Sequence, residues 1–156
     1  MVGEVVVKKI LAAIDRSKYK ERIIAYAISL WKAWGAEVTA IHVIDPGRGV
    51  PGGRIKEKEK QREEEAERPA EDLLSEAELQ AKKQGINLRK EIVEESDTVE
   101  KAIIEYAKKN NIDVILIGTT GMSAAEEVFL GSVANSVIHH AHWGLFLIRY
   151  RILCEL

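Results

Sequence analysis

Two glycine-rich turns in the last third of the chain carry residues that could bind an anion. The apolar run Asp113–Ile117 ends at Gly118, Gly121 follows, and Gly131–Ser132 come after nine intervening residues. Glycine lets the backbone turn tightly and approach a ligand, because it has no Cβ. Backbone N–H groups at a helix start attract phosphates. Further hydroxyl donors nearby belong to Thr119, Thr120 and Ser132.

A second candidate residue, Asp15, directly follows the apolar run Ile10–Ile14. An ionisable side chain after a buried strand rarely serves packing, and this one could accept hydrogen bonds from ribose hydroxyls or hold Mg²⁺. The glycine spacing is neither a Walker A loop nor Gly-x-Gly-x-x-Gly. From spacing alone, nucleotide binding and ordinary turn glycines are equally good interpretations.

Composition limits the classes of protein to which the chain can belong. Its 156 residues suit one domain, residues 1–156, and its net charge of −2 gives no general attraction to nucleic acid or anionic membrane. Cys154 is the single cysteine, which excludes an intrachain disulfide and a cysteine-based zinc site. The sequence shows no signal peptide and no apolar run long enough to span a bilayer, so we expect a cytoplasmic protein.

Apolar runs predict five strands, several of them buried on both faces as in parallel sheets. The first is predicted from Val5–Val7 and Ile10–Ile14, interrupted by two lysines. The others are predicted at Val38–Ile44, Asn87–Glu94, Asp113–Ile117 and Leu145–Tyr150. Asn87–Glu94 alternates apolar and charged residues, which indicates a half-exposed strand near a sheet edge.

Four helices are predicted between these strands. The first begins at Ser17 and ends with Gly35 as its C-cap, and the second begins near Pro69. The third follows an Asp97/Glu100 capping pair, and the fourth runs from Ser132 to about His140. The alternation predicts an α/β fold with an open, doubly wound parallel sheet and helices on both faces. In the strand order 3-2-1-4-5, Asp15 and Gly118 would be neighbours where the order reverses.

Three further segments allow more than one interpretation. Gly47–Gly53 is rich in glycine and is predicted to be a mobile loop. Lys56–Arg68 alternates in charge, which favours a solvated helix over a partner-binding arm. His139, His140 and His142 could bind a metal, but no carboxylate or cysteine is close in sequence, and histidines favour helix C-termini. His42 in its predicted strand is interpreted as a hydrogen-bonded core residue.

The glycine motif, with the runs Ile10–Asp15 and Ile41–Asp45, resembles the ATP-binding motif of the universal stress protein family over the whole chain. The resemblance implies a five-stranded sheet in the order 3-2-1-4-5, adenine nucleotide binding, a homodimer and a role in stress adaptation. It implies that Ala13 and Val43 contact the adenine and Asp15 the ribose. Ile117 and Gly118 would line the base and ribose. The implied phosphate contacts are Gly121, Gly131, Ser132 and Val133, with Thr119 as a further donor.

The chain departs from the family pattern at two positions that are commonly basic, where it has Thr120 and Met122. We therefore expect either ATP, with Mg²⁺ or Arg16 compensating for the missing positive charge, or a ligand with fewer phosphates, ADP or AMP. Apart from Asp15, no protein ligand to a metal and no catalytic residue is expected. Three functions stay open: a nucleotide-binding regulatory module with an unknown protein partner, a slow ATPase, and a nucleotide-free dimeric scaffold.

The strand Leu145–Tyr150 would lie at a sheet edge in this order. An apolar edge strand exposes unpaired backbone groups and tends to associate. Antiparallel pairing with the same strand of a second copy would cover it. The predicted homodimer contact is therefore this strand.

Overall fold

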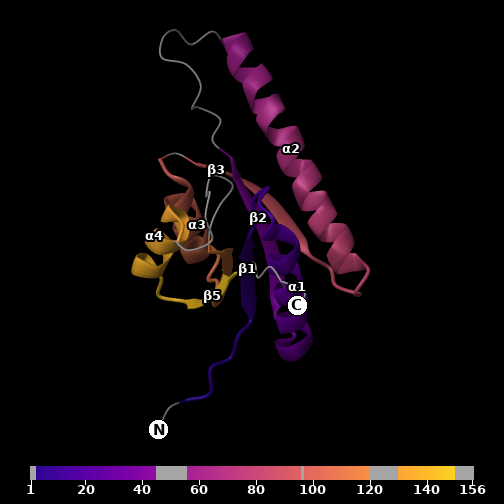
Figure 1. Ribbon diagram of the computed structural model, residues 1–156, viewed down its shortest axis with the longest axis vertical. Helices are drawn as coiled ribbons and strands as arrows, with labels where there is room; N and C mark the ends of the chain where they lie inside the picture. Colours follow the sequence, from indigo (N-terminus) through magenta and orange to yellow (C-terminus); the bar gives the residue numbers. More distant parts are fainter. Residues whose placement is uncertain (1–2, 45–55, 96, 120–129, 150–156) are drawn as a thin grey trace, which may run out of the picture.

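The computed structural model describes residues 3–44, 56–95, 97–119 and 130–149, of which 56–66 are described by their backbone alone. Strands and helices alternate along these residues, as the sequence predicts (Figure 1). The strands are β1 (Lys9–Ala13), β2 (Glu37–Ile44), β3 (Arg89–Glu94), β4 (Val114–Gly118) and β5 (Gly144–Ile148). The helices are α1 (Lys20–Trp34), α2 (Lys56–Lys82), α3 (Val99–Lys109) and α4 (Ser132–His140).

The five strands form one parallel sheet in the order β3-β2-β1-β4-β5, which confirms the predicted fold. The order reverses between β1 and β4, where Ala12 lies opposite Leu116. In Figure 1 the N-terminus lies at the bottom, so the carboxyl ends of the strands point towards the top. The two edge strands, β3 and β5, have half-exposed and exposed positions, as predicted for Asn87–Glu94.

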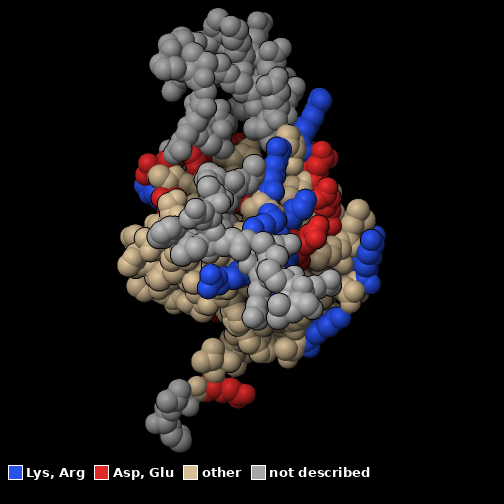
Figure 2. All heavy atoms as spheres, viewed as in Figure 1, with Lys and Arg blue, Asp and Glu red and all other residues tan. Residues whose placement is uncertain are grey.

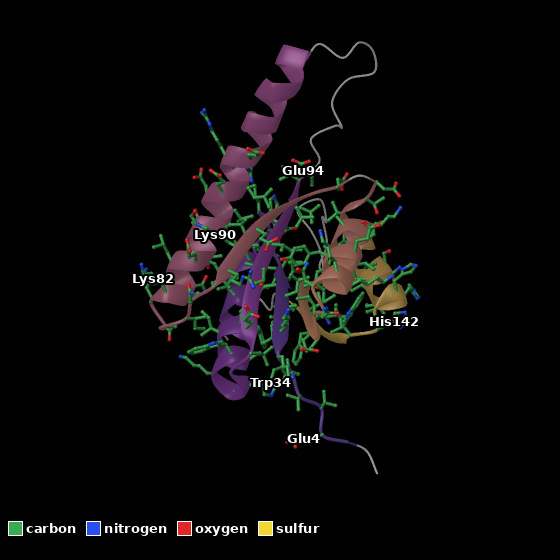
Figure 3. The ribbon with its side chains drawn as sticks, turned by 180° about the vertical axis from the view of Figure 1, so that it is seen from behind. Glu4, Trp34, Lys82, Lys90, Glu94 and His142 are labelled. Carbon is green, nitrogen blue, oxygen red and sulfur yellow. The ribbon has the colours of Figure 1, made fainter. Side chains whose placement is uncertain are left out.

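Two hydrophobic cores lie on opposite faces of the sheet. Helices α1 and α2 cover one face and α3 and α4 the other, on the right and left of Figure 1. Ile10, Leu11 and Ala12 of β1 are fully buried, because the central strand is covered on both sides. An ion pair of 2.6 Å between Lys90 Nζ and Glu78 Oε2 links β3 to α2, and Lys90 is labelled beside this helix in Figure 3.

The predicted first strand is too long. Val5 and Val6 are 84% and 62% exposed, and β1 begins only at Lys9. Lys9 lies opposite Glu37, the first residue of β2, so the neighbouring strand begins at the same level. The Asp113 carboxylate also accepts hydrogen bonds from the N–H groups of Lys8 and Lys9, which anchors the start of β1 beside that of β4.

The first helix begins at Lys20 and not at Ser17 as predicted. The N–H of Ser17 donates to Asp15 Oδ1 at 2.9 Å, and the N–H of Tyr19 donates to Ser17 Oγ at 3.3 Å. Such side-chain acceptors stabilise a turn in place of helix. The predicted C-cap is confirmed: Gly35 has φ 66°, and its N–H donates to the carbonyl of Trp31.

The second helix begins at Lys56, which confirms the helix favoured for Lys56–Arg68. The predicted separate start near Pro69 is wrong, because the two segments form one continuous helix. Proline removes one helical hydrogen bond, but the helix continues through it. The alternating charges of Lys56–Arg68 favour helix by themselves, whereas buried side chains begin at Ala70. The upper part of α2 reaches past the sheet (Figure 1), and Figure 2 shows charged side chains gathered on this side of the molecule.

Other boundaries differ from prediction by one or two residues, and one cap is different. Thr98 caps α3, because its Oγ1 accepts the N–H of Lys101, whereas Asp97 pairs with the Lys101 ammonium at 2.9 Å. The predicted Asp97/Glu100 pair is therefore wrong. The loop Gly47–Gly53 and Tyr150 lie outside the described residues. Within the described ranges, no helix is both long and apolar enough to cross a bilayer.

The half-buried phenol of Tyr106 links α3 to the edge of the sheet. Burial, and then a hydrogen bond to Glu91 of β3, raise the pKa of Tyr106 to about 12. The folded protein therefore holds this proton more tightly than the unfolded chain, whose tyrosine pKa is about 10. We expect this contribution to the free energy of unfolding to be complete below about pH 10 and to be lost as the pH rises to about 12.

The measurement is an alkaline titration of tyrosinate absorbance, with Tyr106→Phe identifying the late step. Glu91→Gln should lower the pKa of Tyr106, because it removes the carboxylate that accepts the phenol hydrogen and repels the phenolate. A late step that persists in Tyr106→Phe would contradict the assignment.

Candidate functional site

A cavity of about 350 Å³ opens at the carboxyl ends of β1, β2 and β4, beside the first turn of α4. This is the place where the strand order reverses, the usual ligand position in open parallel sheets. Its walls come from the ends of three strands, the turn after β1, the first turn of α1, one side of α3 and the start of α4. The lining residues are Ala13, Ile14, Asp15, Ser17, Ile23, Ile41, His42, Val43, Val99, Ile103, Ile117, Gly118, Thr119, Gly131, Ser132, Val133 and Ala134.

The structure brings together nine of the ten residues predicted from the sequence for a ligand site. They come from four separate parts of the chain, and all of them line this one cavity. They are Ala13, Asp15, Val43, Ile117, Gly118, Thr119, Gly131, Ser132 and Val133. The tenth, Gly121, lies outside the described residues, as do Thr120 and Met122.

One wall of the cavity is apolar. Ala13, Ile41 and Ile117 come from three neighbouring strands, and Ile103 of α3 belongs to the same buried cluster. Val43 packs against this cluster and is only partly buried. Such a wall can pack against a planar, weakly polar group such as a heterocyclic base, with dispersion and desolvation as the source of affinity.

Asp15, in the turn after β1, supplies a carboxylate to the lining of this cavity. It is half-buried, and its Oδ1 accepts the Ser17 N–H at 2.9 Å. A carboxylate has about four acceptor positions on its two oxygens, so one backbone donor leaves capacity for hydroxyl groups of a ligand or for a cation. Asp15 is thus both part of a local turn and able to bind a ligand.

The start of α4 presents backbone donors. Its N-cap is Gly131, which has no side chain to accept a hydrogen bond from the helix, and the first turn contains no acidic residue. The N–H groups of the first turn have no partner within the helix, and they attract anions. The N–H of Gly131 donates to the Thr119 carbonyl at 2.6 Å, so this helix start is held directly beside the end of β4.

The described lining residues include one acid, Asp15, and neither lysine nor arginine. Among the described lining residues, the groups that could attract an anion are therefore the backbone N–H groups and dipole of α4 and not a lysine or arginine side chain. The space-filling view agrees with this distribution, because its charged side chains gather over α2 and not over α4 (Figure 2).

Sequence reasoning missed several of the lining residues. Val99 and Ile103 are four residues apart on α3 and share a face, which their helical spacing could have indicated. His42 is hydrogen-bonded, as predicted, but it also lines the cavity, and Ser17 lies in a turn and not in α1. Ser17 is only two residues from Asp15, and an Asp-x-Ser turn could have indicated it. No local pattern brings His42 to the same cavity as Asp15.

The histidines at the end of α4 lie elsewhere. His140 Nδ1 bonds the Ser136 carbonyl at 2.8 Å, and the ring of His142 meets the edge of Trp143. His142 lies at the outer edge of the molecule in Figure 3. Among residues that the structure describes, no group of three or more potential ligands could hold a metal ion.

Comparison with known proteins places the chain in a family. The model of the universal stress protein family matches residues 7–149. The chain belongs to the universal stress protein family. A universal stress protein of Methanocaldococcus jannaschii is 33% identical over 153 residues, which cover 94% of this chain and 85% of that protein. The family resemblance deduced from the glycine motif is therefore confirmed.

Solved structures of universal stress proteins share the fold. UspA from Lactobacillus plantarum superposes with a TM-score of 0.81 at 23% identity, covering 94% of this chain and all of that one. A universal stress protein from Archaeoglobus fulgidus in complex with dAMP gives 0.64 at 24% identity, covering 93% and 100%. Another, in complex with cAMP, gives 0.68 at 18% identity, covering 94% and 100%.

Proposed function

We propose that this universal stress protein is a single-domain, cytoplasmic regulatory module that binds an adenine nucleotide and acts as a homodimer with a further protein partner. The observation that carries the proposal is the cavity between β1 and β4, which is lined both by Asp15 and by the start of α4. An apolar wall, a carboxylate and free helix N–H groups match the three parts of a nucleotide. The dAMP and cAMP complexes of two family members support the same ligand class.

In this proposal each part of the cavity contacts one part of the ligand. Ala13, the backbone of Val43 and Ile117 contact the adenine, and Asp15 accepts hydrogen bonds from the ribose. Gly118 allows the sugar to approach the end of β4. The phosphates bind the backbone and hydroxyl donors of Thr119, Gly121, Gly131, Ser132 and Val133. Mg²⁺ is bound mainly through the phosphates, and Asp15 is the one carboxylate among the described lining residues that could also contact it.

Because the described lining contains neither lysine nor arginine, we expect the affinity to depend on how many phosphates the nucleotide carries. Each added phosphate brings negative charge towards Asp15 without a cationic side chain there to balance it. We expect AMP to bind at least as tightly as ATP when no Mg²⁺ is present, and Mg²⁺ to raise the affinity for ATP more than that for AMP. Isothermal titration with AMP, ADP and ATP, with and without Mg²⁺, measures both effects.

The same titrations, combined with an assay of phosphate release, distinguish the regulatory module, the slow ATPase and the nucleotide-free scaffold. If none of the three nucleotides binds, the nucleotide proposal fails and the nucleotide-free dimeric scaffold is favoured. If ATP binds far more tightly than AMP without Mg²⁺, the charge argument is wrong. Tight ATP binding without phosphate release over hours would exclude the slow ATPase, which needs an oriented water and stabilisation of charge at the γ-phosphate.

The proposed dimer contact is the edge strand β5, extended to the predicted bounds Leu145–Tyr150. Leu147 of this strand is 38% exposed. A charge at this position would be desolvated by a second copy, so Leu147→Asp should shift the protein to monomer by at least about tenfold in dissociation constant. Analytical ultracentrifugation over a concentration series measures the shift. Leu79→Asp is the matched control, because Leu79 is 59% exposed on α2; dissociation by this control instead would place the interface on α2.

A further inference from the structure

We infer that His42 is a positioning residue for Asp15, an inference that rests on the proposed nucleotide site. His42 does this through the backbone of Ile14, the residue that precedes Asp15. The three residues come from two neighbouring strand ends, β1 and β2, and all of them line the cavity. The imidazole thereby orients the carboxylate before any ligand enters.

The contact is short and its direction is defined by chemistry. His42 Nδ1 lies 2.7 Å from the carbonyl oxygen of Ile14. A carbonyl oxygen only accepts, so Nδ1 carries the proton, and in the neutral ring Nε2 is left as an acceptor. The N–H of Ile14 in turn donates to the carbonyl of Ile41 at 2.9 Å. Both polar groups of the Ile14 backbone are therefore bound by consecutive residues of β2.

These two hydrogen bonds, which we call the Ile14 clamp, lie where the pairing between β1 and β2 stops. The last paired residue of β1 is Ala13, opposite Ile41, so Ile14 is one residue beyond the strand. Past that point the chain turns away towards α1, and the backbone carbonyl of Ile14 is bound by a side chain. The side chain of Ile14 is itself buried in the core beneath α1 and α2. The backbone is thus fixed immediately before Asp15.

The other side of Asp15 is also held. Its Oδ1 accepts the Ser17 N–H at 2.9 Å, and Ser17 Oγ accepts the Tyr19 N–H at 3.3 Å. Both Ser17 and Tyr19 are buried. With His42 before it and Ser17 after it, the carboxylate has a defined orientation in the empty protein. Such preorganisation lowers the entropy lost when a ligand binds, so removal of the clamp should weaken binding.

Three substitutions of His42 distinguish positioning from direct ligand contact. His42→Asn retains a donor N–H one bond beyond Cγ, as in the imidazole Nδ1, but has nothing at the place of Nε2. His42→Gln places its amide one bond further, towards the reach of Nε2, and lacks a donor at Nδ1. His42→Leu lacks both. Positioning predicts that AMP affinity falls about tenfold in the Leu and Gln variants and by less than about threefold in the Asn variant.

Titration of AMP into each variant gives the first readout. If His42→Asn loses AMP affinity while His42→Gln retains it, the positioning role is wrong and His42 contacts the ligand through Nε2. Wild-type affinity in all three variants would also overturn the inference. If His42→Leu does not fold, the Asn and Gln pair still gives the answer, because these two variants differ in the place of the donor and not in polarity.

A second readout needs no nucleotide. Hydrogen exchange of the Ser17 amide, measured by NMR in nucleotide-free protein, reports whether Asp15 Oδ1 still accepts this N–H. We expect faster exchange in the Leu and Gln variants, recovery in the Asn variant, and no change at the Gly35 amide, which bonds Trp31 at the far end of α1. Unchanged Ser17 exchange in the Leu variant would refute the positioning role. If the wild type binds no nucleotide, the proposed function fails, while this readout still tests the clamp.

Discussion

Asp15→Ala is expected to lower the affinity for AMP by at least about tenfold. A hydrogen bond to a charged group contributes about 1.5–3 kcal/mol, and Asp15 is the one charged side chain among the described residues that line the cavity. Asp15→Asn should lose less, because its amide oxygen can still accept the Ser17 N–H and one ribose hydroxyl. Isothermal titration of both variants with AMP measures the difference.

The matched control is Asp72→Ala, which removes an exposed carboxylate from α2, away from the cavity. It should leave AMP affinity unchanged and so exclude an effect of net charge alone. Thermal melting of each variant shows whether the fold is retained, because Asp15 also accepts a hydrogen bond from Ser17 in the turn before α1. Equal AMP affinity in Asp15→Ala and the wild type would refute the assignment of the ribose contact.

Leu116→Ala is expected to lower the free energy of unfolding by about 3 kcal/mol, within the 2–5 kcal/mol range of such core truncations. Leu116 is 0% exposed at the centre of β4 and lies opposite Ala12 of β1. Its removal leaves a cavity that a sheet covered on both faces cannot easily fill. The same two strands carry Asp15 and Gly118 to the ligand cavity, so AMP affinity should fall as well.

Urea denaturation of the two proteins measures the change, with Leu79→Ala as the control. Leu79 is 59% exposed on α2, so the same truncation there should change the free energy of unfolding by no more than about 0.5 kcal/mol. Similar losses in both variants would contradict the assignment of the core to the β1–β4 interior.

Much of the fold could be predicted because the signals are local. Buried parallel strands need continuous apolar runs, helices need apolar residues at helical spacing, and their alternation leaves few possible topologies. The site residues follow similarly: Asp15 and Gly118 each end an apolar run, and Gly131 precedes a helix. Parallel strands bring all their carboxyl ends to one edge of the sheet, so these residues meet there although they are far apart in sequence.

The errors occur where contacts between distant residues compete with local pattern. Val5–Val7 has strand-forming residues, but the neighbouring strand starts only opposite Lys9. Serine is a common residue at a helix start, so Ser17 is a natural prediction. In the structure, however, the side chains of Asp15 and Ser17 accept backbone hydrogen bonds that stabilise a turn there. Pro69 looks like a first helical residue, yet α2 tolerates it in its interior.

The amino-acid sequence by itself determined the order of the elements, the parallel sheet and the family, because each follows from runs and spacings within a few residues. Only the tertiary structure decided what surrounds Asp15. His42 is 28 residues away from Ile14 in sequence, and the register of β1 against β2 brings its ring to the Ile14 carbonyl. A contact of this kind depends on how two strands pair and on where one of them turns away. The glycine motif therefore predicts the ligand class, whereas strand register positions the carboxylate that we propose binds it.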